Sequence, residues 1–180
     1  MFERFTRNAR VVVIGAQETA TRVGATEVRP AHLLEALAAT DGVLAMQVLA
    51  QLGAPGDEVR RVVRGLNAQY SDGLDAEDAE ALKLLGIDLH DVISRIEGDL
   101  NDGRGPIPKG HKRFARESKK VLELSLREAI QLGDGFIGTE HVLLGILRQG
   151  DTTALETLKA FGLTVGDVRR AVAEADRRAG

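Results

Sequence analysis

The chain contains the same sequence twice, and this repeat constrains its fold more than any other feature. Residues 5–63 align without a gap on residues 114–172, at an offset of 109 positions. Of the 59 aligned pairs 14 are identical, well above the level of unrelated segments. Repeated segments of this kind fold as equal units that pack against each other. The sequence therefore predicts two copies of one structural unit.

Composition and periodicity predict that each unit is helical. The chain is 43% hydrophobic but only 3% aromatic, so its core must be built from Leu, Val, Ile and Ala, a composition that favours helices. Apolar residues recur at helical spacing along 5–23 and 114–132, and a glycine follows each stripe. Three further helical segments follow in each copy. We expect an all-α fold of two pseudo-symmetric four-helix repeats.

The segment between the copies carries a further, partial repeat. Residues 80–92 align with residues 156–168 at an offset of 76, which predicts an extra helix pair inserted between the two repeats. The predicted division is a first repeat at 1–66, an inserted partial repeat and linker at 67–113, and a second repeat at 114–180.

Charge and residue content exclude several classes of function. A net charge of −3 argues against nucleic acid as a partner, and we expect Arg60-Arg61 and Arg169-Arg170 to lie on solvated helix faces. There is no cysteine, no nucleophile with a neighbouring base and no phosphate-binding loop, so we expect neither an enzyme nor a cofactor. No apolar run approaches the ~20 residues that span a bilayer, and we expect a soluble cytoplasmic protein with no membrane partner.

Two strings in the second copy resemble a known family. Lys-Lys-Val-Leu-Glu-Leu-Ser-Leu-Arg-Glu-Ala at 119–129 precedes Phe-Ile-Gly-Thr-Glu-His-Val-Leu-Leu-Gly at 136–145, and the chain opens with Met-Phe-Glu-Arg-Phe-Thr. Together they resemble the N-terminal substrate-handling domain of Clp ATPases, especially of the ClpC branch. The resemblance implies a stand-alone Clp N-type domain that lacks the ATPase modules.

The same resemblance implies a non-catalytic binding function. The expected ligands are peptides, protein partners or cyclic peptide antibiotics, and the expected role is to modulate ClpC–ClpP proteolysis as an adaptor, a competitor or a decoy. Partners would then be the ClpC–ClpP machinery, its substrates and arginine-phosphorylated proteins. The alternative is a helical regulatory or scaffold protein unrelated to proteolysis.

The resemblance also implies two groups of site residues. In the family, cyclic peptides bind where the N-terminus and first helix meet the start of the second repeat. The alternative is that Val13 and Phe114 are core residues, and that Lys119 and Glu123 form a solvated ion pair. The positions that match the cyclic-peptide face are Phe2, Arg10, Val13, Gln17, His111, Phe114, Lys119 and Glu123.

The second group is the start of the helix at Thr139 and Glu140. By resemblance, Glu140 holds the guanidinium of phosphoarginine, while Thr139 and the helix-start amides favour its phosphate. The alternative is that both residues stabilise a helix N-terminus. Ala31 occupies the equivalent place in the first copy and has no carboxylate. The duplicated His32 and His141 lack further ligands at metal spacing, so we expect structural histidines and no metal site.

Overall fold

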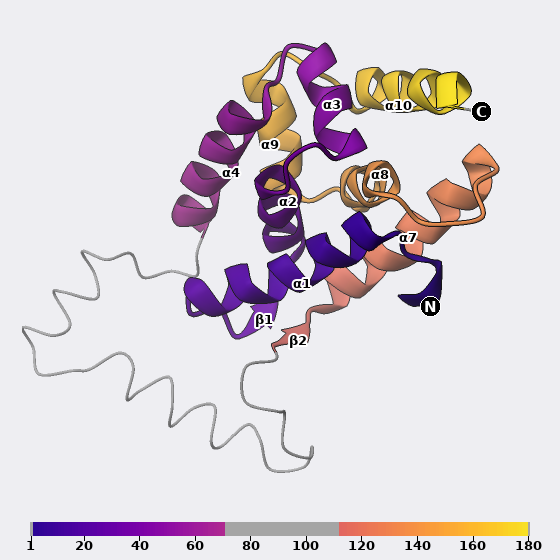
Figure 1. Ribbon diagram of the computed structural model, residues 1–180. Helices are drawn as coiled ribbons and strands as arrows, with labels where there is room; N and C mark the ends of the chain where they lie inside the picture. Colours follow the sequence, from indigo (N-terminus) through magenta and orange to yellow (C-terminus); the bar gives the residue numbers. More distant parts are fainter. Residues whose placement is uncertain (1, 71–111, 180) are drawn as a thin grey trace, which may run out of the picture.

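The computed structural model describes residues 2–70 and 112–179 (Figure 1). Within them the first repeat forms four helices, and the second repeat forms four more. The predicted inserted helix pair lies outside the described residues. The helices of the first repeat are α1 (Arg7–Arg22), α2 (Pro30–Ala39), α3 (Leu44–Gln51) and α4 (Gly56–Tyr70). Those of the second are α7 (Arg116–Leu132), α8 (Thr139–Gln149), α9 (Thr152–Ala160) and α10 (Val165–Ala179).

The two repeats share one local structure, as the sequence predicts. Adding 109 to the first residue of α1, α2 and α4 gives the first residue of α7, α8 and α10, and for α3 and α9 the match is within one residue. Glycines that close helices do so with positive φ: 68° at Gly24 and 90° at Gly133. Only glycine adopts this backbone without a Cβ penalty. The prediction of two pseudo-symmetric four-helix repeats is confirmed.

Short backbone ladders join the repeats. Strand β1 (Glu27–Val28) pairs in parallel with β2 (Arg113–Phe114), and Phe5 forms a parallel bridge with Ile137. Adding 109 to Phe5 gives Phe114, and adding 109 to Val28 gives Ile137. The bridge Phe5–Ile137 and the pair Val28–Phe114 are therefore the same contact with the roles of the repeats exchanged. The repeats are related by a pseudo-two-fold axis, as in a symmetric dimer.

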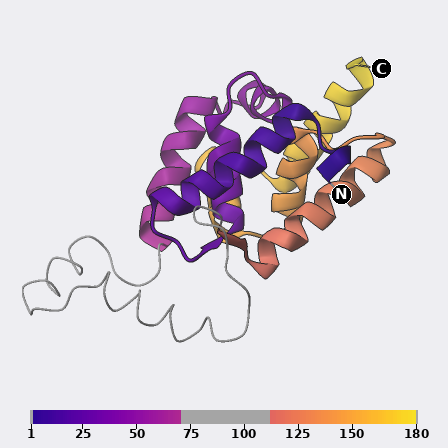
Figure 2. The ribbon, with the colours of Figure 1, turned by 60° about the horizontal axis from the view of Figure 1, so that its bottom comes forward.

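The repeats also exchange their closing helices. α4 of the first repeat packs against α9 of the second, and α10 of the second packs against α3 of the first (Figure 1). These two contacts are again equivalent under exchange of the repeats. The buried side chains of both repeats form one continuous core, and the C-terminal end of α10 projects from it (Figure 2). The positions of surface residues near the junction of the repeats therefore depend on the packing of both halves of the chain.

Among the described residues, no single helix is long and apolar enough to cross a membrane. α2 and α3 together satisfy length and composition, but they meet at an angle of 82°. Both helices belong largely to the core.

Candidate functional site

The first half of the predicted cyclic-peptide face lies on α1, beside the seam between the repeats. Gln17 accepts a hydrogen bond at its Oε1 from the Lys112 backbone N–H, at 2.7 Å, and so ties α1 to the chain that enters the second repeat. Arg10 donates from Nε to the Phe5 carbonyl at 3.1 Å. Val13 is only 3% exposed and belongs to the core, which is the alternative considered for this residue.

The other half lies on β2 and α7. Phe114 is half-buried on β2 and packs against the core. Lys119 and Glu123 line an open hollow of about 530 Å³ on the outer side of α7, and no residue of α1 lines it. The structure therefore brings Lys119 and Glu123 together, without placing them in one pocket with Arg10 or Gln17. The backbone of Phe2 lies in η1 (Phe2–Arg4), and His111 falls outside the described residues.

Glu123 does not form the ion pair with Lys119 that the sequence suggests as an alternative. Its carboxylate pairs with Lys120, at 3.0 Å, and with Arg127. The hydrogen bond from Lys120 is the main cause that lowers the pKa of Glu123. Lys119, Lys120 and Arg127 all lie three or four residues from Glu123 and so are within reach of its carboxylate. The structure pairs it with Lys120 and Arg127.

Thr139 and Glu140, the predicted phosphoarginine residues, are buried at the first turn of α8. Thr139 is 3% exposed and donates its hydroxyl to Glu140 Oε2 at 3.3 Å. The carboxylate of Glu140 folds back over Gly138, where a Cβ would lie 1.9 Å from Glu140 Oε1. A carboxylate in this place stabilises the helix N-terminus through its dipole. In this conformation Glu140 interacts with its own helix.

The two duplicated histidines have the structural role that the sequence predicts. His141 accepts the Gly138 backbone N–H at Nδ1 at 2.9 Å, and His32 accepts that of Arg29 at 3.0 Å. Each ring satisfies a backbone donor at a helix start, where intrahelical acceptors are missing. Asp134 Oδ2 lies 3.0 Å from Nε2 of the buried His141.

Asp134, Glu140 and His141 place possible ligand atoms within 4.8 Å of one another. Because Nδ1 of His141 accepts an N–H, the proton of the neutral ring sits on Nε2. A metal at Nε2 would then require an imidazolate, and a metal at Nδ1 would displace the backbone bond. His32 makes the same bond where Ala25 and Ala31 replace the two acids. The chemistry of this cluster is that of a helix start, not of a metal centre.

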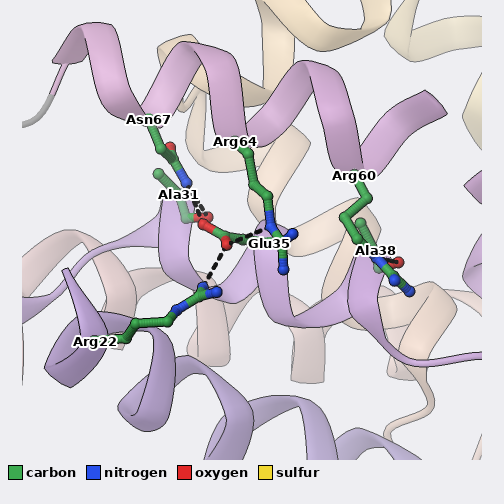
Figure 3. A network of polar contacts seen from close by, with 7 residues as sticks. All are labelled: Arg22, Ala31, Glu35, Ala38, Arg60, Arg64 and Asn67. Atoms are coloured by element: carbon green, nitrogen blue, oxygen red, sulfur yellow. Dashed lines mark hydrogen bonds and ion pairs between the residues drawn. The ribbon is translucent and has the colours of Figure 1, made fainter. Parts of the chain in front are cut away.

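A buried glutamate that the sequence analysis missed holds the first repeat together. Glu35 on α2 has a side chain 4% exposed, and it accepts bonds from Arg22 at 2.6 Å, Arg64 at 3.2 Å and Asn67 at 3.0 Å (Figure 3). Burial acts to raise the pKa of Glu35, but the bonds from Asn67, Arg22 and Arg64 outweigh it, and the pKa lies below its ordinary value. One carboxylate thus links α1, α2 and α4.

Glu128 links three helices of the second repeat in the same way, but from a position that is not equivalent to Glu35. It is fully buried on α7 and binds Arg148 at 2.9 Å and Arg169 at 2.7 and 3.0 Å. Here too burial opposes the arginine bonds and the pKa is lowered. The positions equivalent to Glu128 and Glu35 are Thr19 and Leu144, so the repeat pattern gives no sign of either network. The sequence feature that could have indicated these networks is a single Glu within a helical stripe of apolar residues.

The prediction that both arginine pairs are solvated was half wrong. Arg169 binds Glu128, and Arg60 donates from Nε to the Ala38 carbonyl at 3.2 Å. The second members, Arg61 and Arg170, are exposed as predicted. The first arginine of each pair thus reaches a neighbouring helix of its own repeat.

Comparison with known families decides what this fold belongs to. The sequence model of the Clp repeat (R) N-terminal domain matches residues 4–78 and again residues 74–161. The chain belongs to this family. The confirmed duplication is therefore that of a Clp N-type domain.

Relatives of this Clp N-type domain are chaperones of much greater length. The chain is 34% identical over 176 residues to the chloroplastic chaperone protein ClpC2 of Oryza sativa subsp. japonica, which covers 96% of the chain and 15% of the relative. It is 28% identical over 172 residues to the chaperone protein ClpB of Oceanobacillus iheyensis, and this alignment covers 96% of the chain and 17% of the relative. The chain thus spans about a sixth of these relatives.

Solved structures show the same fold. The N-terminal domain of the Caseinolytic protease associated chaperone ClpD from Arabidopsis thaliana aligns with a TM-score of 0.65 at 22% identity, over 100% of this chain and 97% of that one. The Hsp104 N-terminal domain from Candida albicans aligns with a TM-score of 0.63 at 17% identity, over 96% of this chain and 91% of that one.

Proposed function

We propose that this Clp N-type domain binds peptides, protein partners or cyclic peptides without catalysing a reaction. Through this binding it modulates ClpC–ClpP proteolysis in the cytoplasm, as an adaptor, a competitor or a decoy. The observation that supports the proposal best is the seam between the repeats, where Gln17 on α1 holds the chain that leads into α7. Both repeats therefore contribute to one surface of fixed geometry.

The charges beside this seam suit a ligand rich in carbonyl groups. Arg10 and Lys119 are both exposed, and they occupy equivalent positions, since 10 plus 109 is 119. Their N–H groups are donors without acceptor capacity. The backbone carbonyls of a cyclic peptide are acceptors that both side chains can bind.

Calorimetry with a ClpC-directed cyclic peptide tests the proposal. We expect Phe2→Ala and Lys119→Ala each to weaken binding by at least about tenfold, as removal of an anchor residue does. Lys159→Ala, an exposed lysine on α9, is the matched control and should leave the affinity unchanged. Unchanged affinity in Phe2→Ala would contradict the site.

A narrower part of the proposal concerns phosphoarginine at Thr139 and Glu140. The α8 N-terminus favours an anion. Binding requires the Glu140 carboxylate to turn away from Gly138 toward the ligand. We expect a phosphoarginine peptide to bind the wild-type domain and not Glu140→Gln, and equal binding to both would remove Glu140 from the site.

A further inference from the structure

A second surface, separate from the seam, lies on the first repeat. It is an open hollow of about 600 Å³ between α1 and α4, with α2 at its base. Figure 3 shows this order of helices, with α2 between α4 and α1. We call it the first-repeat groove. The residues used below are Val11, Ile14, Gly15, Glu18, Arg22, Glu35, Ala36, Ala39 and Arg64.

The α1 wall of the first-repeat groove is apolar and exposed. Val11 is 46% exposed and Ile14 is 59% exposed, and their i,i+3 spacing places them side by side. Gly15 and Ala36 are small, and a Cβ on Gly15 would lie 3.3 Å from that of Ala36. The small residues Gly15 and Ala36 therefore leave the base of the groove open, and the exposed side chains of Val11 and Ile14 form its apolar wall.

The second repeat shows that the fold does not require this apolar wall. Lys120 and Glu123 occupy the positions of Val11 and Ile14 and pair with each other at 3.0 Å. Leu124 occupies the position of Gly15 and is 6% exposed. The hollow that Lys120 and Glu123 line is bordered entirely by charged residues and a glutamine. The exposed apolar wall is thus particular to the first repeat.

One end of the first-repeat groove carries an excess of guanidinium groups. Arg22 and Arg64 share the single carboxylate of Glu35, and their side chains are 53% and 52% exposed. Among the described residues, Arg64 meets Glu35 through Nε alone. Its terminal N–H groups are thus available for a second carboxylate, which arginine binds well.

We infer that the first-repeat groove binds an amphipathic helical segment of a partner protein, with an apolar stripe against Val11 and Ile14 and an acidic side chain against Arg64. Grooves that receive a helix in this way read apolar anchors at i, i+3 or i+4 spacing. Glu18 lies on the α1 wall, so the acidic residue of the partner must face the α4 wall. This sets the orientation of the helix in the groove.

The first-repeat groove is independent of the proposed cyclic-peptide face. At 100° per residue, the mean direction of Val11, Ile14 and Glu18 on α1 lies about 100° from that of Arg10, Val13 and Gln17. Ile14 is a neighbour of Arg10 at i,i+4, whereas Val11 lies about 100° or more from Arg10, Val13 and Gln17, so a variant at Val11 leaves the cyclic-peptide face intact.

Fluorescence anisotropy with a labelled model peptide tests the inference. The probe is a helical peptide with leucine along one face and glutamate beside it, and its twin carries glutamine in place of each glutamate. We expect Ile14→Glu, which copies Glu123, to lower the affinity for the probe at least about tenfold. Ile130→Glu, at an isoleucine on α7 that is 62% exposed, is the matched control and should change nothing.

Arg64 is tested by comparing the two peptides. We expect Arg64→Ala, which copies Ala173 of the second repeat, to reduce the affinity for the glutamate peptide to that for its glutamine twin. Thermal melts check that each variant is folded, and Ile14→Glu at an exposed position tests the groove even where Arg64→Ala is unstable.

Three results would overturn the inference. They are the absence of saturable binding to the wild-type domain, an equal loss of affinity in Ile130→Glu, and a dimer in sedimentation that Ile14→Glu dissociates, since a second copy would then occupy the groove. Cyclic-peptide binding should persist in Val11→Glu, which alters the same apolar wall at a position turned away from Arg10 and Gln17, so failure here is distinct from failure of the proposed function.

Discussion

Two buried glutamates show how individual residues stabilise this fold. Glu35 and Glu128 each accept bonds from two arginines that reach in from neighbouring helices. A buried charge is tolerated only when such partners replace its lost hydration. The arginines are themselves partly exposed, so they keep some water while they neutralise the acid. Each network joins three helices of its own repeat through a single carboxylate.

Glu128→Gln should destabilise the domain by about 3 kcal/mol, the lower end of the range for breaking a buried pair, because Arg148 and Arg169 remain partly hydrated. Urea unfolding followed by circular dichroism measures the change. The exposed Glu156→Gln on α9 is the control and should stay within about 0.5 kcal/mol of wild type. A loss no larger than that of the control would show that the network adds nothing to stability.

Stability should also fall in acid. The pKa values of Glu35 and Glu128 lie below their ordinary value of 4.5, so their contribution is fully present above that pH and is lost as the pH falls through the folded-state values. Asp151 acts in the opposite direction, because burial raises its pKa, and its contribution is lost as the pH rises.

We expect the two glutamates to outweigh Asp151, since each binds two arginines. The free energy of unfolding should therefore decrease as the pH is lowered below about 4.5, and Glu128→Gln should reduce this slope. Urea titrations at a series of pH values measure both slopes. Parallel slopes in wild type and variant would exclude Glu128 as a source of the acid sensitivity.

At the scale of elements, the sequence predicted most of what the structure shows. The 109-residue offset, the helix-closing Gly24 and Gly133, and the duplicated histidines all have their expected places. These features depend on local backbone chemistry, which repeats with the sequence. Arg60 differs from expectation because its partner, the Ala38 carbonyl, is brought close only by tertiary structure, which leaves no periodic pattern in the sequence.

His141→Ala should destabilise the second repeat by about 2–4 kcal/mol, because it leaves the buried Gly138 N–H without an acceptor and opens a cavity. His32→Ala should cost less, since His32 is 7% exposed and water can reach it. Thermal unfolding of both variants gives the comparison, with the exposed Gln131→Ala on α7 as the control. An equal cost at both histidines would contradict the importance of burial here.

At the scale of the whole molecule, the sequence predicted two repeats packed together, and the structure shows that they interleave. α4 packs on α9, and α10 packs on α3, so each repeat covers part of the other's core. The sequence carries no sign of this exchange, because the apolar face of a closing helix is the same whichever repeat it covers. The Thr139 hydroxyl, which accepts the Ala45 N–H at 3.4 Å, is one of the contacts created between the repeats.

This exchange predicts that neither repeat folds alone. Fragments 1–70 and 112–180 each lose the other repeat's closing helix and half of the two parallel ladders, so each exposes part of a shared core. Domains this small are marginal even with a complete core. We expect each isolated fragment to lack a cooperative thermal transition in circular dichroism, and an equimolar mixture to regain one.

Ile137→Asp in the second fragment should abolish this recovery, because Ile137 is fully buried and pairs with Phe5. Phe136→Asp, at a neighbour that is 52% exposed, is the matched control and should still permit it. A cooperative transition in fragment 1–70 alone would contradict the interleaved core and would mean that the repeats are independent units joined only at their surfaces.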